Sequence, residues 1–131
     1  MLADRFADAV VGSDADALKR ALADDVVFRS PVLYRPYEGK EIVGRIITEA
    51  AMKVFSDFRY VDRFEDGDAA ALVFEARVGD REVQGLDLLR FHDDGRVREL
   101  TVMVRPMSGL LAVAEAMGRE FERLGIAPTS G

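Results

Sequence analysis

Residues 72–91 read LVFEARVGDREVQGLDLLRF, and this stretch decides the fold. The dipeptide Gly79-Asp80 at its centre is typical of a two-residue hairpin turn, and hydrophobic residues alternate with polar ones on either side of it. A turn of that length fixes which residues face each other across the two strands. The predicted pairs are Arg77 with Glu82, Ala76 with Val83, Glu75 with Gln84, Phe74 with Gly85 and Leu72 with Asp87.

Two further turn signals, Asp66-Gly67 and Asp94-Gly95, extend the hairpin on both sides. They predict four consecutive strands between residues 57 and 105, joined by hairpins into one antiparallel sheet. The register continues through the second of these turns. The pairs predicted there are Leu89 with Leu100 and Asp87 with Val102.

Hydrophobic residues at helical spacing predict four helices around this sheet. They are a short helix through Phe6 and Val10 that ends at Gly12, a second capped by Ser13, a long helix over residues 40–55, and a last helix capped by Ser108 and ended by Gly125. A separate strand over residues 26–30 ends at Pro31. Because helices and strands do not alternate, the predicted class is α+β, with helices on one face of a twisted sheet. We expect one domain over residues 1–126 and a flexible tail over 127–131.

The composition excludes several functions. The chain of 131 residues has no cysteine and one histidine, His92, so the sequence predicts no thiol chemistry, no metal site and no cofactor. Its 24 acidic and 18 basic residues give a formal net charge of −6, which argues against nucleic acid as a partner. The acidic start of the chain and the lack of a long apolar run predict a cytoplasmic protein that does not bind membranes.

Asp87 is the one polar residue on the hydrophobic face of the predicted sheet. A charged carboxylate without a partner costs several kcal/mol at such a position, so its environment must compensate. Two interpretations are open. The carboxyl accepts a structural hydrogen bond, for example from a backbone amide or an arginine, or it lies in a pocket with a raised pKa and handles protons.

The opposite face of the same strands also carries hydrophobic side chains, which a monomer would expose to water. The helices are needed on the Asp87 face, so we expect a homodimer through this outer face; a second layer of the chain's own helices is the alternative. The residues concerned are Ala71, Val73, Leu86, Leu88, Thr101 and Met103.

Four short strings, in their order and spacing, resemble the nuclear transport factor 2-like superfamily, in its SnoaL-like and ketosteroid-isomerase-like branch. The resemblance implies a cone-shaped fold, in which a curved sheet wraps around helices and leaves a mostly apolar pocket. The strings are ADDVVFRSP at residues 23–31, PYEGKEI at 36–42, GLDLLRF at 85–91 and DGRV at 94–97.

The resemblance does not extend to all the residues of a ketosteroid isomerase. Ser30 stands where those enzymes have a general-base Asp, and Phe6 stands where they have an oxyanion-hole Tyr. A supporting Tyr on their long helix falls at about the position of Ile47. Asp87 alone matches, at their second oxyanion-hole acid. Without base and phenol we expect no steroid isomerase activity.

Other members of the superfamily need different groups. SnoaL-type cyclases are implied to transfer protons with a single pocket Asp, which Asp87 can supply. The epoxide hydrolases need an Asp-Arg-Asp set, and the inner face offers no second carboxylate. Arg63 reaches the pocket only if the face of its strand, residues 57–65, that carries Arg63 points inward. The length of the Asp66-Gly67 turn leaves open whether that face carries Arg63 or Phe58, Tyr60, Asp62 and Phe64.

We therefore expect a pocket for an apolar small molecule with one polar handle, in a cyclase, isomerase or dehydratase that uses Asp87. A non-catalytic binding protein with the same pocket and a dimeric interaction module are the alternatives. The last helix is expected either as a lid or as core. The residues expected to bind the ligand are Phe28, Ser30, Tyr34, Phe74, Leu89, Leu100, Val102 and Val104.

Overall fold

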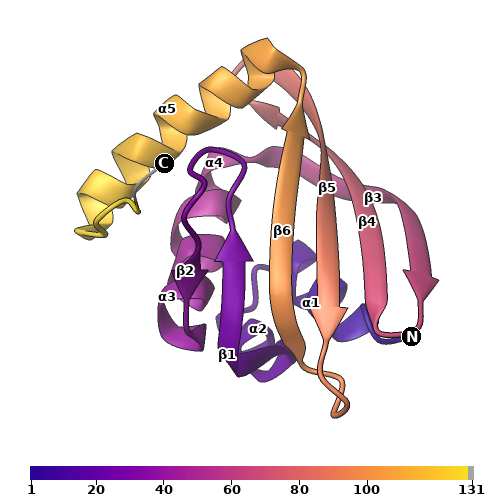
Figure 1. Ribbon diagram of the computed structural model, residues 1–131. Helices are drawn as coiled ribbons and strands as arrows, with labels where there is room; N and C mark the ends of the chain where they lie inside the picture. The colour runs from indigo at the N-terminus through magenta and orange to yellow at the C-terminus, as the bar shows by residue number, and fades with distance from the viewer. Residues whose placement is uncertain (130–131) are drawn as a thin grey trace.

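The computed structural model describes residues 1–129, whose helices lie against one side of a curved sheet (Figure 1). The helical elements are α1 Asp4–Val11, α2 Ala15–Ala21, α3 Lys40–Arg45, the π-helical segment η1 Ile46–Ala51, α4 Met52–Val54 and α5 Met107–Leu124. The strands are β1 Leu22–Arg29, β2 Tyr37–Glu38, β3 Ser56–Asp66, β4 Ala69–Val78, β5 Arg81–Phe91 and β6 Val97–Arg105. The α+β class and the curved sheet are confirmed.

The six strands form one sheet in the order β2-β1-β6-β5-β4-β3. The predicted meander from β3 to β6 is antiparallel, and its register is as expected: Leu72 pairs with Asp87, and Asp87 with Val102. The sheet is nevertheless mixed, because β1 runs parallel to β6. The long connection between these two strands permits a parallel pairing, which no hairpin could make.

The helix boundaries follow the predicted hydrophobic pattern, but two of the predicted caps are wrong. Asp14, not Ser13, caps α2, where its side chain accepts a hydrogen bond from the Ala17 amide. Ser108 lies inside α5, which starts after Pro106 and has no side-chain cap. The expected end of α5 at Gly125 is confirmed by its left-handed conformation, with φ 70°.

The long helix predicted over residues 40–55 is present but is not regular. Its middle part, η1, is a π-helix, which is wider than an α-helix and often occurs at functional sites. The Thr48 hydroxyl donates a hydrogen bond to the Gly44 carbonyl, 2.8 Å away, at the start of this part. Ile46 and Ile47 are both buried here and belong to the hydrophobic core.

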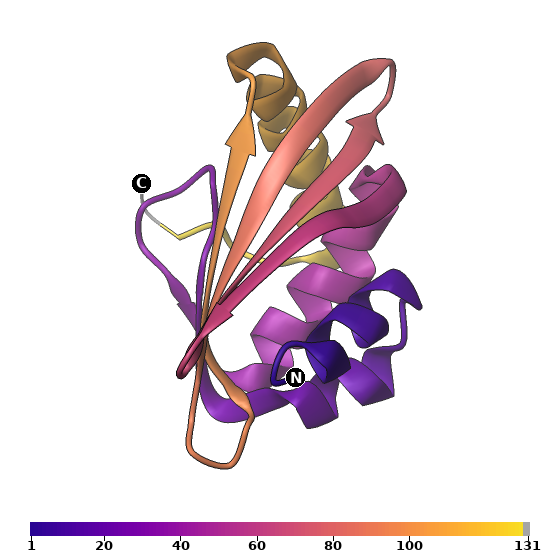
Figure 2. The same ribbon diagram turned by 90° about the vertical axis from the view of Figure 1, so that its right-hand side faces the viewer.

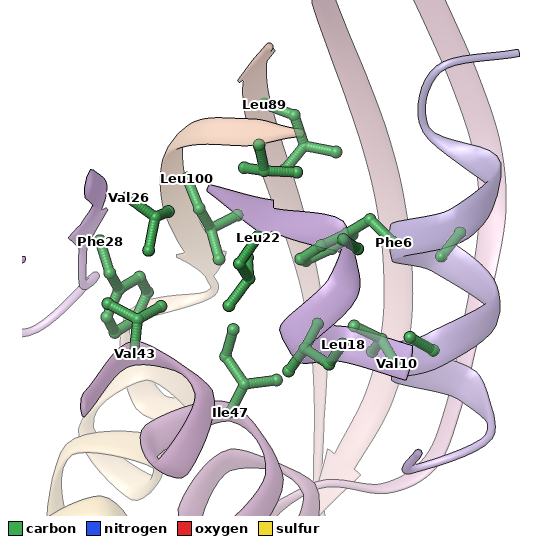
Figure 3. Close-up of a cluster of buried hydrophobic side chains, with 14 of the residues drawn as sticks. Phe6, Val10, Leu18, Leu22, Val26, Phe28, Val43, Ile47, Leu89 and Leu100 are labelled. Carbon is green, nitrogen blue, oxygen red and sulfur yellow. The ribbon is translucent and has the colours of Figure 1, made fainter. Parts of the chain in front are cut away.

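All the helices lie on one side of the sheet in Figure 2. Side chains from α1, α2, β1 and the long helix meet there in a closely packed core (Figure 3). Its largest fully buried members include Phe6, Leu18, Leu22, Leu89 and Leu100. This core closes one end of the space between helices and sheet.

A β-bulge in β3 resolves which of its faces is inward. Tyr60 pairs with Phe74, but the next paired residue is Asp62, so Val61 is extra. The bulge turns Arg63 to the same inner side as Tyr60, where its guanidinium bonds to the Asp4 carboxylate. The two faces that the sequence presented as alternatives are thus combined in one strand, and Phe64 is 60% exposed on the outside.

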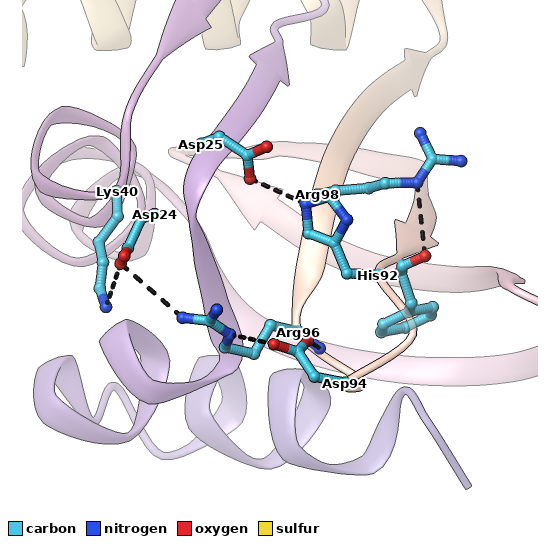
Figure 4. Close-up of polar contacts among 8 residues, drawn as sticks. Asp24, Asp25, Lys40, His92, Asp94, Arg96 and Arg98 are labelled. Atoms are coloured by element: carbon cyan, nitrogen blue, oxygen red, sulfur yellow. Dashed lines mark hydrogen bonds and ion pairs between the residues drawn. The ribbon is translucent and has the colours of Figure 1, made fainter.

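Polar side chains join the β5–β6 turn to β1 (Figure 4). A register shift between Leu22 and Val27 leaves Asp24 and Asp25 exposed on β1. His92 Nε2 lies 2.9 Å from Asp25 Oδ1, and Arg96 pairs with both Asp94 and Asp24. Exposed pairs of this kind each contribute little to stability, but together they favour the parallel pairing of β1 with β6.

The outer face of the meander carries the hydrophobic residues predicted for it, and no helix within residues 1–129 covers them (Figure 2). Met103 is half exposed and Phe64 lies on the same face. Dimerisation through this face stays a prediction. In the part of the chain that is described, no helix has the length and apolar character needed to cross a membrane.

Candidate functional site

A cavity of about 490 Å³ lies between the inner face of the sheet, the long helix and α5. Its walls are almost entirely apolar and are rich in aromatic rings. The lining residues include Phe6, Phe28, Tyr37, Ile46, Ile47, Phe55, Phe58, Phe74, Asp87, Leu100, Val102, Val113, Met117 and Phe121. The last helix, expected either as a lid or as core, therefore forms one wall of the cavity.

Asp87 is the polar feature of this cavity. Its side chain lines the cavity and is only 6% exposed, between the cross-strand neighbours Leu72 and Val102. The Tyr60 hydroxyl donates a hydrogen bond of 2.7 Å to Asp87 Oδ2. Both interpretations offered by the sequence therefore apply, since the carboxyl has a structural partner and also faces a pocket.

Burial raises the pKa of Asp87 from its ordinary 3.8 to about 7, and the hydrogen bond from Tyr60 opposes that rise. Burial also raises the pKa of Tyr60 well above its usual value, and the neighbouring Asp87 charge adds to that effect. Tyr60 consequently stays protonated as a donor, whereas Asp87 is present at neutral pH in both its acid and its carboxylate form.

These two side chains give the cavity one defined chemical capability. Tyr60 occupies Asp87 Oδ2, so Oδ1 is the oxygen left for a ligand. As an acid it donates a hydrogen bond or a proton, and as a carboxylate it accepts one. A group that titrates near neutral pH is well matched to general acid and base catalysis.

We expect the Tyr60→Phe variant to raise the pKa of Asp87 above that of the wild type, because it removes the hydrogen bond that favours the carboxylate. The ¹³Cγ chemical shift of Asp87, followed by NMR against pH, measures this. Tyr34→Phe is the matched control, since Tyr34 is 87% exposed. If the titration midpoint of Asp87 is unchanged or lower in Tyr60→Phe, the Tyr60 phenol does not stabilise the Asp87 carboxylate.

The structure brings five of the predicted ligand residues to the cavity with Asp87, namely Phe28, Ser30, Phe74, Leu100 and Val102. Leu89 is fully buried in the core and does not line the cavity. Tyr34 and Val104 border a second pocket, of about 590 Å³, between the β1–β2 loop and β6. Alternation along the strands puts Leu89 and Val104 on the inner face, where both pack with the hydrophobic clusters and do not line this cavity.

The three positions that differ from a ketosteroid isomerase all line the cavity: Phe6, Ser30 and Ile47. The Ser30 hydroxyl oxygen accepts hydrogen bonds from the amides of Leu33, at 3.0 Å, and Val32, at 3.3 Å. Ser30 therefore stabilises the turn after β1. None of the three supplies a carboxyl or a phenol.

Sequence reasoning did not resolve the other polar groups on the inner side of the fold. Tyr60 was indicated only through its strand. Tyr37, for which the sequence leaves open a place at the pocket mouth or packing within the loop after Pro31, is buried on the cavity wall. A second carboxyl comes from outside the sheet, because Glu122 of α5 also borders the cavity. Glu65 lies on the inner side of β3, and its Oε2 is buried without a hydrogen-bond partner among the described residues. Among residues 1–129 no three His, Cys, Asp or Glu side chains cluster as a metal site requires.

A family model described as the SnoaL-like domain matches residues 3–100. The match covers most of the chain, which therefore belongs to the SnoaL-like family. Solved structures of nuclear transport factor 2-like proteins share its fold, as the four sequence strings predicted.

Solved structures agree with this assignment. A steroid delta-isomerase from Pseudomonas aeruginosa is 41% identical to the chain with a TM-score of 0.88, over 96% of this chain and 93% of that one. An uncharacterized bacterial protein with a cystatin-like fold, from Silicibacter pomeroyi DSS-3, is 28% identical with a TM-score of 0.88, over 92% and 85%. Comparison with the curated proteins finds no match.

Proposed function

We propose that the protein binds an apolar small molecule carrying one oxygen function, with that oxygen at Asp87. The observation that carries this proposal is a buried carboxyl, hydrogen-bonded to Tyr60, in an otherwise apolar cavity of about 490 Å³. A pocket of this kind holds its ligand by the hydrophobic effect and orients it through its few polar groups.

We further propose that Asp87 transfers a proton to or from the bound oxygen, as a cyclase, isomerase or dehydratase requires. Support comes from its pKa of about 7, which supplies both protonation states at neutral pH. In a dehydration, Oδ1 gives its proton to a hydroxyl that leaves as water when the C–O bond breaks, and the carboxylate takes a proton from the adjacent carbon as the double bond forms. In a cyclisation, it gives its proton to the carbonyl oxygen as the C–C bond forms and regains one from the carbon that attacks. Tyr60 keeps its own proton and holds the carboxyl in place. No cofactor enters this proposal.

Binding without turnover is the second candidate function. It is favoured by Phe6, Ser30 and Ile47, which line the cavity and supply neither a carboxyl nor a phenol. The same residues argue against steroid isomerisation by a separate base and oxyanion pair, although the Pseudomonas relative carries the name steroid delta-isomerase. We infer that this chain shares the fold of that relative and differs in its chemistry from an isomerase with a separate base and oxyanion pair.

A homodimer through the outer sheet face is part of the proposal. Support comes from Phe64 and Met103, which are 60% and 51% exposed, and from the hydrophobic residues between them. These are Val73, Leu86, Leu88 and Thr101, which the strand register puts on the same face. Burying such a patch against a second copy removes it from water.

We expect 2-naphthol, which has one hydroxyl on an apolar ring system, to bind about tenfold more tightly than naphthalene, because only 2-naphthol can hydrogen-bond to Asp87. Fluorescence titration measures both affinities. Asp87→Leu should abolish the preference and leave naphthalene binding, whereas Asp87→Asn should retain part of it.

Naphthalene serves as the control within each variant, because it reports the shape of the cavity without the polar handle. Equal affinities of the wild type for the two compounds, or a preference that survives in Asp87→Leu, would contradict the assignment of Asp87 as the ligand's polar partner.

A further inference from the structure

Residues 126–129, called here the C-terminal strap, run along one side of the cavity. The chain turns away from α5 at Gly125, and the Ile126 amide donates a hydrogen bond of 2.9 Å to the Phe121 carbonyl. Ile126 and Pro128 both line the cavity. Figure 2 shows the strap, in yellow, leaving α5 and reaching the loop between β1 and β2. The strap thus spans from one wall of the cavity to another.

Two hydrogen bonds from Thr129 fasten the end of the strap. Its hydroxyl donates to the Arg35 carbonyl at 2.6 Å, and its amide donates to the Tyr37 hydroxyl at 3.1 Å. The Tyr37 ring belongs to the cavity wall, where it stacks on Phe28 and meets Phe121 edge-on. The strap is therefore held by a side chain that itself borders the ligand space.

Within residues 1–129, few other contacts hold the strap closed. Ile126 is buried, with 7% exposure, but Ala127 and Pro128 are exposed. Releasing the strap breaks the two Thr129 hydrogen bonds and uncovers one isoleucine, while α5 and the sheet keep their contacts. Segments with few buried contacts open locally at a small fraction of the free energy of global unfolding.

We propose that the C-terminal strap is the gate of the cavity, and that ligands enter and leave when Thr129 releases Arg35 and Tyr37. This inference rests on the proposed function, because it requires that the cavity take up an apolar ligand. A gate that must open for both entry and exit controls the association rate and the dissociation rate of the ligand equally. Weakening its anchor therefore raises the association and dissociation rates together and leaves Kd unchanged.

The test uses 2-naphthol and the Thr129→Val variant, which loses the hydroxyl bond to Arg35 and keeps the size of the side chain. Stopped-flow fluorescence follows the naphthol directly, since the chain has no tryptophan. We expect both rates to rise about fivefold, as the loss of one hydrogen bond predicts. Thr48→Val is the matched control, because the Thr48 hydroxyl also bonds a backbone carbonyl but lies off the strap.

Unchanged rates in Thr129→Val, or a weaker Kd at an unchanged association rate, would overturn the gate. If the wild type does not bind 2-naphthol, the proposed function fails, and amide hydrogen exchange tests the gate without a ligand. The Ile126 amide should then exchange about fivefold faster in Thr129→Val than in the wild type and remain unchanged in Thr48→Val. Equal exchange in all three proteins would also overturn it.

Discussion

Asp87→Asn should gain stability relative to the wild type as the pH rises from 4 to 8, by on the order of 4 kcal/mol in the free energy of unfolding. The reason is that burial raises the pKa of Asp87 from 3.8 to about 7, so ionisation above pH 4 is opposed in the folded state. Asparagine keeps the shape and can still accept the hydrogen bond of Tyr60, but it never ionises. Urea denaturation of both proteins at several pH values measures the difference.

The sign follows from proton binding. Between about pH 4 and pH 7 the folded wild type holds the Asp87 proton and the unfolded chain does not, so the contribution of Asp87 to stability is complete below pH 4 and is lost as the pH approaches 7. Asp4, Asp25 and Asp94 have lowered pKa values and act in the opposite direction. Both proteins contain them, so subtracting one curve from the other removes them. A difference that stays constant over this range would contradict a buried, titrating Asp87.

Gly85→Ala should destabilise the protein by about 3 kcal/mol, because the added methyl group has no room. A Cβ at Gly85 would lie 2.0 Å from Phe74 Cζ and 2.3 Å from Cε2. The Phe74 ring cannot retreat easily, since it stacks on Phe58 at 4.8 Å between centroids and meets Phe55 edge-on at 5.6 Å. Moving the ring would push it into the cavity, so 2-naphthol binding should weaken as well.

Gly118→Ala is the control for this substitution. Gly118 lies in α5, and a Cβ built there meets no atom within 4 Å, so alanine should be neutral or stabilise the helix by about 0.5 to 1 kcal/mol. Thermal or urea unfolding compares the two variants. A Gly85→Ala protein as stable as the wild type would mean that Phe74 does not lie over Gly85.

The sequence was sufficient to place Asp87. A two-residue turn at Gly79-Asp80 permits only one register, and the period of two along a strand then puts Asp87 among hydrophobic residues. Its partner Tyr60 could not be placed, because the bulge at Val61 changes the face of β3 partway along the strand. Regular alternation contains no signal for such an extra residue.

The other differences between the predictions and the structure also arise from tertiary structure. The parallel pairing of β1 with β6 depends on a long connection, which local patterns do not describe. Leu89 and Val104 have the alternation of cavity residues, but both pack with the hydrophobic clusters and do not line this cavity. The flexibility of the tail over residues 127–131 stays a prediction. Thr129 has hydrogen bonds to Arg35 and Tyr37, and residues 130–131 lie outside the described part of the chain.

The pKa of Asp87 itself, measured by NMR on ¹³C-labelled wild-type protein, tests the proposed role of the cavity most directly. The Asp87 ¹³Cγ signal is assigned by its absence from Asp87→Asn and is followed from pH 3 to pH 9. We predict a midpoint at about 7, which burial beside Tyr60 requires. A midpoint close to 3.8 would show a solvated carboxylate and would contradict both the buried site and the proton transfer proposed for it.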